Sequence, residues 1–112
     1  MDQSLQRLQT DYVDIYQLHW PERKANFFGQ RGFKKQDDAW EDNIHEVLTT
    51  LEGFVQQGKI KHIGLSNETP WGLMRFIEEH KYHNLPKIKT VQNPYSLLNR
   101  SFEVGNAEVC LR

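Results

Sequence analysis

Three short stretches of the sequence carry polar side chains that could act on a substrate: His19, the pair Ser66 and Asn67, and the pair Gln92 and Asn93. A neutral imidazole can donate a hydrogen bond to a substrate carbonyl oxygen. Side-chain amides carry both a donor and an acceptor, so asparagine and glutamine can bind another amide. If these side chains lie close together in the fold, they predict a site that binds an amide group and polarises a carbonyl group beside it.

Each of these residues also has an ordinary structural explanation. A histidine at the end of a strand can simply hydrogen-bond a neighbouring carbonyl, Asn67 can be a turn residue, and Gln92 can make a strand-end hydrogen bond. Taken singly, these alternatives stay open. Their repetition favours function, because three successive strands would each deliver a polar group to the same place.

The segments that precede these polar groups are rich in aromatic and β-branched residues, which is typical of strands. The predicted strands are Tyr12–His19, Ile60–Ser66 and Ile88–Gln92. A long polar and aromatic loop, 20–38, follows the first strand. Loops of that length in a compact domain are usually functional or disordered.

Helices are predicted between the strands. The first helix is predicted from apolar residues with amphipathic spacing, and Gly58 is expected to cap its end. These apolar residues are Ile44, Val47, Leu48, Leu51, Phe54 and Val55. Thr69 and Pro70 are typical of a helix start, and Asn84 and Pro86 of its end, with Leu73, Phe76 and Ile77 facing the core. Shorter helices are expected over 2–8 and 102–111.

This alternation predicts βαβ units and a parallel sheet with right-handed crossovers. Both helices then fall on one face, whereas parallel sheets are normally covered on both. The sheet either becomes doubly wound or curls into a barrel. No G-x-G-x-x-G loop follows the first strand, although another doubly wound type remains possible. Polar residues at the carboxyl ends favour an α/β fold that is part of a (β/α)8 TIM barrel with consecutive βαβαβ units.

Composition narrows the class of protein. The chain has 112 residues and a formal net charge of -1, so it predicts one small domain and no nucleic-acid partner. No apolar run is long enough for a membrane helix, so no membrane partner is expected. A single cysteine, Cys110, cannot form an internal disulfide, which predicts a cytoplasmic protein. The abrupt ends suggest a piece of something longer.

Other residues receive plainer interpretations. His80 and His83 lie three apart, a spacing that could bind metal, but no cysteine or carboxylate stands at a matching position, so no metal is expected. His45 and His62 are expected on the surface, and Cys110 is expected to pack rather than react. Trp20, Phe27 and Phe28 lie in the long loop; they could line a substrate pocket or simply pack the loop down.

Three stretches, "SLQRLQTDYVDIYQLHWP", "GKIKHIGLSN" and "VQNPYSLLNRSFEVG", resemble the middle of an aldo-keto reductase, most closely the Tas-like bacterial subgroup. The resemblance implies an NADPH-dependent oxidoreductase that reduces a small aldehyde or ketone to an alcohol. It further implies that His19 orients and polarises the carbonyl. Ser66, Asn67 and Gln92 would hold the nicotinamide carboxamide.

The family's proton-donating tyrosine, with its lysine and aspartate, comes from earlier strands, and the segment that grips the adenosine phosphate comes later. Tyr12, Tyr16, Tyr82 and Tyr95 do not stand in the tyrosine's motif, so none is given its role. Residues 1–112 are therefore expected to be an internal fragment of about three of the eight βα units, inactive alone. The alternative is a non-catalytic nicotinamide-binding or regulatory module of the same fold.

Three strands cannot close a barrel, so one face of the sheet should meet water. That face is expected to carry Val13, Ile15 and Val91. A core of this size leaves little net stability after conformational entropy. We therefore expect weak folding, or self-association through the uncovered face.

Overall fold

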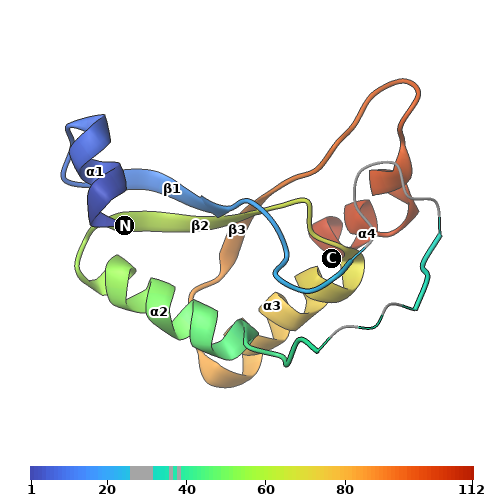
Figure 1. Ribbon diagram of the computed structural model, residues 1–112, viewed down its shortest axis with the longest axis horizontal. Coiled ribbons are helices and arrows are strands. Elements are labelled where there is room, and N and C mark those ends of the chain that lie inside the picture. Colours follow the sequence, from blue (N-terminus) through green and yellow to red (C-terminus); the bar gives the residue numbers. More distant parts are fainter. Residues whose placement is uncertain (26–31, 36, 38) are drawn as a thin grey trace.

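The computed structural model describes residues 1–25, 32–35, 37 and 39–112. Phe27 and Phe28, predicted to line a substrate pocket, lie outside the described residues. None of the described helices is long and apolar enough to cross a membrane. In chain order the elements are α1 (Asp2–Leu8), β1 (Val13–Leu18), α2 (Ile44–Gln56), β2 (Ile60–Ser66), α3 (Pro70–His83), β3 (Ile88–Gln92), the 3-10 turn η1 (Ser101–Val104) and α4 (Asn106–Leu111) (Figure 1).

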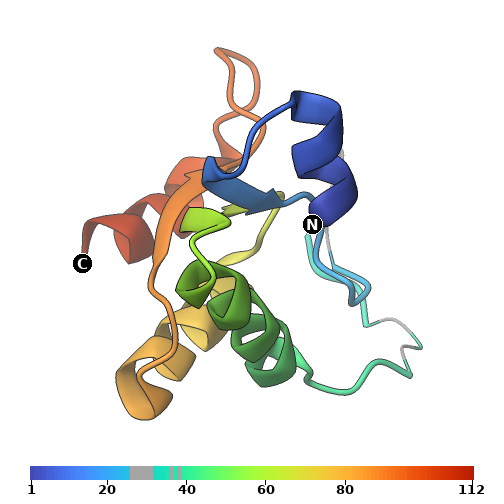
Figure 2. The ribbon, with the colours of Figure 1, turned by 90° about the vertical axis from the view of Figure 1, so that its left-hand side faces the viewer.

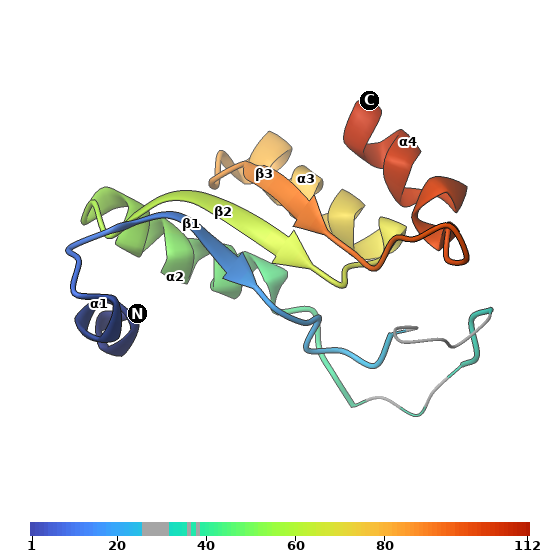
Figure 3. The ribbon, with the colours of Figure 1, turned by 90° about the horizontal axis from the view of Figure 1, so that it is seen from above.

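The strands form one parallel sheet in the order β1-β2-β3. Seen from above, the three arrows point the same way, so their carboxyl ends share one edge of the sheet (Figure 3). Helices α2 and α3 lie together on one face of that sheet (Figure 2). The predicted βαβαβ arrangement of a partial (β/α)8 barrel is thereby confirmed.

Local capping explains where the helices begin and end. Thr69 Oγ1 accepts a hydrogen bond from the Gly72 backbone N–H at 3.3 Å, and Pro70 occupies the first turn of α3. Asn84 closes the same helix in the left-handed conformation, with φ of 56°. Gly58, just beyond α2, has φ of 72°, a conformation that glycine adopts without strain. These stop and start signals were predicted from the sequence and are confirmed.

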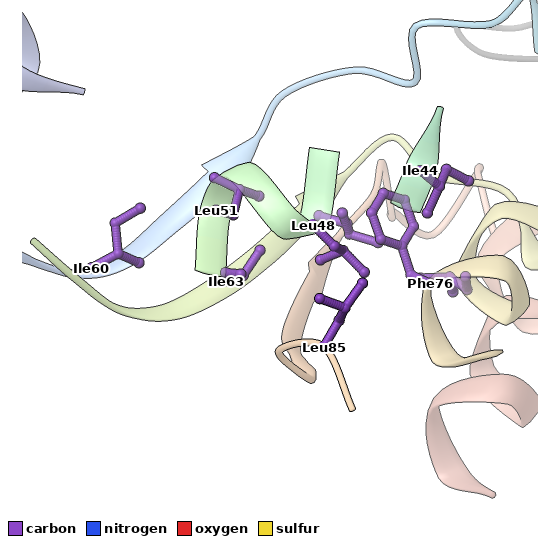
Figure 4. Close-up of a cluster of buried hydrophobic side chains, with 9 residues drawn as sticks. Ile44, Leu48, Leu51, Ile60, Ile63, Phe76 and Leu85 are labelled. Atoms are coloured by element: carbon purple, nitrogen blue, oxygen red, sulfur yellow. The ribbon is translucent and has the colours of Figure 1, made fainter. Parts of the chain in front are cut away.

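The core lies between β2 and the two long helices (Figure 4). Strand β2 is the middle strand, and Leu48 of α2 is fully buried against this layer. The buried core residues are Ile44, Leu48, Leu51, Ile60, Ile63, Leu65, Leu73, Phe76 and Leu85. Burial of each large side chain contributes about 1.5–3 kcal/mol, so this single layer holds the helices against the sheet.

The structure corrects three details. The expected helix over 102–111 is interrupted at Gly105, where an added Cβ would lie 2.8 Å from Pro70 Cγ. Ile77, expected in the core, is 37% exposed. Val13 and Val91, expected on the open face, pack against the core instead. For Val91 the cause is a register shift at β2, which places it opposite buried Leu65.

The face of the sheet opposite the helices still carries apolar surface. Ile15, in β1, is 47% exposed, and the exposed His62 of β2 lies opposite it. Self-association through this face stays a prediction.

Gly64, in the middle of β2, is required by close packing on the open face. A Cβ at this position would lie 2.4 Å from Thr90 Oγ1 and 3.3 Å from Ile15 Cγ2. We expect Gly64→Ala to destabilise the chain by about 1–3 kcal/mol, the usual cost of overpacking. Chemical unfolding followed by circular dichroism measures the loss. In a Thr90→Ala background, which removes the nearest atom, the same substitution should cost clearly less; an equal cost would contradict this steric explanation.

Candidate active site at the carboxyl ends of the strands

Asn67 joins the carboxyl ends of all three strands. Its side-chain Nδ2 donates to the His19 carbonyl at 2.9 Å and to Ser66 Oγ at 3.1 Å. Its backbone N–H donates to the Gln92 carbonyl at 2.9 Å. Asn67 has φ of 57°, a left-handed conformation in which asparagine is enriched among non-glycine residues. The structure therefore brings the four predicted site residues to one edge of the sheet, around a turn that favours asparagine.

Gln92 is held on the open face by a residue that sequence reasoning missed. Gln17 Nε2 donates to Gln92 Oε1 at 2.8 Å, from β1 to β3. The pair crosses the middle strand, and an added Cβ at Gly64 of that strand would lie 3.4 Å from Gln17 Oε1. The available signal was alternation, because Gln17 precedes His19 by two residues and such residues share a face.

Asn67 and Gln92 each keep one side-chain amide atom without a hydrogen-bond partner among the described residues. Asn67 uses its Nδ2 group, which leaves Oδ1 as an acceptor. Gln92 uses Oε1 as an acceptor, which leaves Nε2 as a donor. A primary carboxamide presents one N–H donor group and one carbonyl acceptor. The remaining atoms of Asn67 and Gln92 are chemically complementary to such a group.

His19 follows β1 directly and is exposed. Its backbone is fixed by the hydrogen bond from Asn67, and its ring lies 5.0 Å from the ring of Trp20. An exposed imidazole held at this edge can present an N–H group to an oxygen atom of a bound molecule.

A buried ion pair anchors the loop that carries Asn67. Both guanidinium Nη atoms of Arg23 donate to the carboxylate of Glu68, and Nη2 also donates to Thr69 Oγ1 at 3.0 Å. The Arg23 side chain is 11% exposed and that of Glu68 only 3%. Trp71 stacks near the guanidinium, with its ring 4.7 Å from Arg23 Cζ. The loop after β2 is thereby tied to the loop after β1.

Gly72 makes room for this ion pair. A Cβ at Gly72 would lie 2.1 Å from Glu68 Oε1 and 2.4 Å from Arg23 Nη2. Sequence reasoning did not identify Arg23 or Glu68, since they are 45 positions apart. A charged residue directly after Ser66 and Asn67 was the only available hint.

Asn93, predicted beside Gln92 at this edge, supports the loop with the Nδ2 group of its side chain. Its Nδ2 donates to the Glu68 carbonyl at 2.7 Å, and Asn106 Nδ2 donates to the same oxygen at 3.1 Å. The two predicted amides therefore have different positions: Gln92 lies on the open face, and Asn93 holds the loop that follows β2.

Trp20 lines a hollow beside this ion pair. The hollow has a free volume of about 570 Å³, open to solvent, and also borders Arg23, Trp40, Ile44 and Phe76. Ile44 and Phe76 belong to the core between the sheet and the helices. Trp20 therefore lies over the helix side of the sheet, not over the open face where Gln17 and Gln92 meet.

Comparisons of this chain with a family model and with individual proteins agree on one family. The model of the Aldo/keto reductase family matches residues 1–112. Protein tas of Escherichia coli is 54% identical over 106 residues, which cover 95% of this chain and 31% of that protein. An aldo-keto reductase of Babesia bovis is 41% identical, over 98% of this chain and 41% of that protein. The uncharacterized oxidoreductase YrpG of Bacillus subtilis is 32% identical, over 93% of the chain. The chain thus spans under half the length of these first two relatives.

Proposed function

The chain belongs to the aldo-keto reductase family, and on that premise we propose that it serves in the NADPH-dependent reduction of a small aldehyde or ketone to an alcohol. The proposal depends on two amide atoms at the strand ends, Asn67 Oδ1 and Gln92 Nε2, which have no hydrogen-bond partner among the described residues. The acceptor on Asn67 and the donor on Gln92 match the carboxamide of a nicotinamide. An oxidoreductase function agrees with the relatives in Babesia bovis and Bacillus subtilis, which are named an aldo-keto reductase and an uncharacterized oxidoreductase.

The donor set fits the implied cofactor. When bound, NADPH supplies the hydride for the reduction. Asn67 Oδ1 would accept from the carboxamide N–H group and Gln92 Nε2 would donate to its carbonyl oxygen, while the hydroxyl of Ser66 accepts a hydrogen bond that fixes the Asn67 side chain. Such contacts select which face of the ring meets the substrate, and placement matters because a 1 Å error can cost about 10²-fold in rate.

His19 acts on the substrate side. Its imidazole N–H donates to the substrate carbonyl oxygen, where negative charge develops during reduction. The hydrogen bond from Asn67 to the His19 backbone couples this donor to the carboxamide site, so one loop sets both positions. Trp20, whose ring lies 5.0 Å from that of His19, is on the helix side of the sheet and is given no part in substrate binding. We expect this chemistry in the cytoplasm, which a single cysteine suits.

The test requires a complete barrel. Residues 1–112 replace the aligned segment of protein tas of Escherichia coli, and the chimera is titrated with NADPH and NADH by fluorescence and assayed with aldehydes and ketones. We expect NADPH binding and consumption of NADPH with formation of an alcohol. Binding without turnover would favour the non-catalytic module, and no binding of either nucleotide would overturn the proposal.

An isosteric variant tests the amide pair directly. Gln92→Glu keeps the Oε1 acceptor for Gln17 but removes the Nε2 donor. We expect about 10-fold weaker NADPH binding, since an unmatched buried polar contact costs about 1–3 kcal/mol. Lys89→Gln, on the same strand and exposed, is the matched control and should bind NADPH as before.

A further inference from the structure

A second group of chemically active side chains lies between α2 and α3, apart from the strand ends. His45 comes from the first turn of α2, and Glu79 and His83 come from the last turns of α3. His45 Nδ1 lies 2.7 Å from Glu79 Oε2, and His83 Nε2 lies 3.8 Å from the same oxygen. Their three ligand atoms all lie within 4.8 Å of one another.

The sequence did not predict this cluster of His45, Glu79 and His83. The expectation of no metal considered His80 and His83, but His80 Nδ1 is 2.7 Å from the Leu85 carbonyl oxygen instead. The carboxylate partner of His83 is Glu79, four positions earlier on the same helix face. His45 is 34 positions from Glu79 and joins it only because the two helices pack together.

The burial of the three residues suits ion binding. The Glu79 side chain is 6% exposed, whereas those of His45 and His83 are 53% and 54% exposed. The carboxylate is therefore fixed inside, and the imidazoles form an accessible outer side. The two rings are 5.0 Å apart and nearly perpendicular, at 84°, so their faces do not stack.

The surrounding charges orient the carboxylate and favour a cation. Arg75 Nη2 donates to Glu79 Oε1 at 2.9 Å, which leaves Oε2 directed at His45. Arg75 also pairs with Asp42 at 2.7 Å and with Glu78 at 2.9 Å. Three carboxylates thus surround one guanidinium, which leaves surplus negative charge beside the cluster.

We propose that His45, Glu79 and His83 bind a divalent cation of the zinc class that links α2 to α3. Two imidazoles and one carboxylate, with water in a fourth position, form a donor set that Zn²⁺ accepts. Bonds of about 2.0–2.2 Å place tetrahedral ligand atoms roughly 3.4 Å apart, a separation inside the range found among these side chains. Arg75 takes the place of the outer partner that commonly orients a ligating carboxylate.

The test uses the 112-residue chain with Cys110→Ser, so that the exposed thiol cannot bind the ion. Isothermal titration with Zn²⁺ is expected to give one ion per chain, and Co²⁺ to give visible absorption bands of an imidazole site. A free ion concentration 100 times Kd should raise the folded-to-unfolded ratio about 100-fold, seen by circular dichroism as a higher melting temperature or as a gain of helix.

Three variants decide between this site and a plain charge contact. His45→Ala and His83→Ala should each weaken Zn²⁺ binding by about 10-fold or more, since even an outer-shell partner is worth about 10–100-fold. His62→Ala, which removes an exposed histidine from the sheet, should bind as before. Equal binding by all three variants, or neither heat of binding nor gain of stability with the parent chain, would overturn the proposal. The result is independent of NADPH binding, because the cluster lies on the helices.

Discussion

Replacing His19 by alanine in the chimeric barrel is expected to lower turnover of a carbonyl substrate by about 10²–10³-fold, the usual loss when one donor to a developing oxyanion is removed. The affinity for NADPH should change little. The side chain of His19 faces solvent, and the Asn67 contact that matters for the cofactor uses only the backbone carbonyl of His19, which alanine retains. Steady-state kinetics and fluorescence titration measure the two quantities separately.

The control is Lys81→Ala, which removes an exposed side chain from α3, on the helix side of the sheet and away from the strand ends. It should leave turnover within about 2-fold of the parent, as expected of a surface substitution away from the site. If His19→Ala turns over at the parental rate, His19 does not polarise the substrate. If cofactor affinity falls together with turnover, His19 acts chiefly by holding the strand end in place.

Loss of Glu68 is expected to produce the largest loss of stability. Glu68→Ala leaves the guanidinium of Arg23 buried without its carboxylate, and breaking such a pair costs about 3–5 kcal/mol. The loop would also lose the hydrogen bond from the Thr69 N–H to Glu68 Oε1 at 2.7 Å. Urea unfolding of the chimera measures the loss. NADPH affinity should fall as well, because Asn67 is the preceding residue of the same loop.

A double-mutant cycle separates the ion pair from simple loss of packing. Arg23→Ala and Glu68→Ala are made singly and together, and the double variant should be more stable than the sum of the single losses predicts, by about 0.5–3 kcal/mol. Strictly additive losses would show that the two side chains do not stabilise each other. Glu46→Ala, an exposed carboxylate on α2, is the matched control and should change the free energy of unfolding by less than about 0.5 kcal/mol.

The fold was predictable because its signals are local. Apolar periodicity, the Thr69 and Pro70 start and the Asn84 stop each act within a few residues, and they placed the helices and strands nearly where they lie. The side of the sheet on which Val91 lies was not predictable. It depends on the register shift between Ile63 and Gly64, which arises only when the strands pair.

The candidate site was predictable in part for the same reason. His19, Ser66, Asn67 and Gln92 each follow a recognisable strand, and parallel strands bring their ends together. Gln17, Arg23 and Glu68 were missed, since their partners lie tens of positions away in the sequence. The cluster of His45, Glu79 and His83 was missed for a similar reason, because it exists only where two helices pack. Contacts between distant segments carry no short-range signature.

The three-stranded order has a consequence for assembly. Among the described strands, β2 is paired on both sides, but β1 and β3 each pair on one side only. Each therefore presents a row of backbone N–H and C=O groups that a further strand can extend, and such edges are templates for strand addition. In a closed barrel those rows are taken by the neighbouring strands. In isolation, β1 of one copy could pair with β3 of the next, so that copies join edge to edge into a continuous sheet that grows from both of its edge strands.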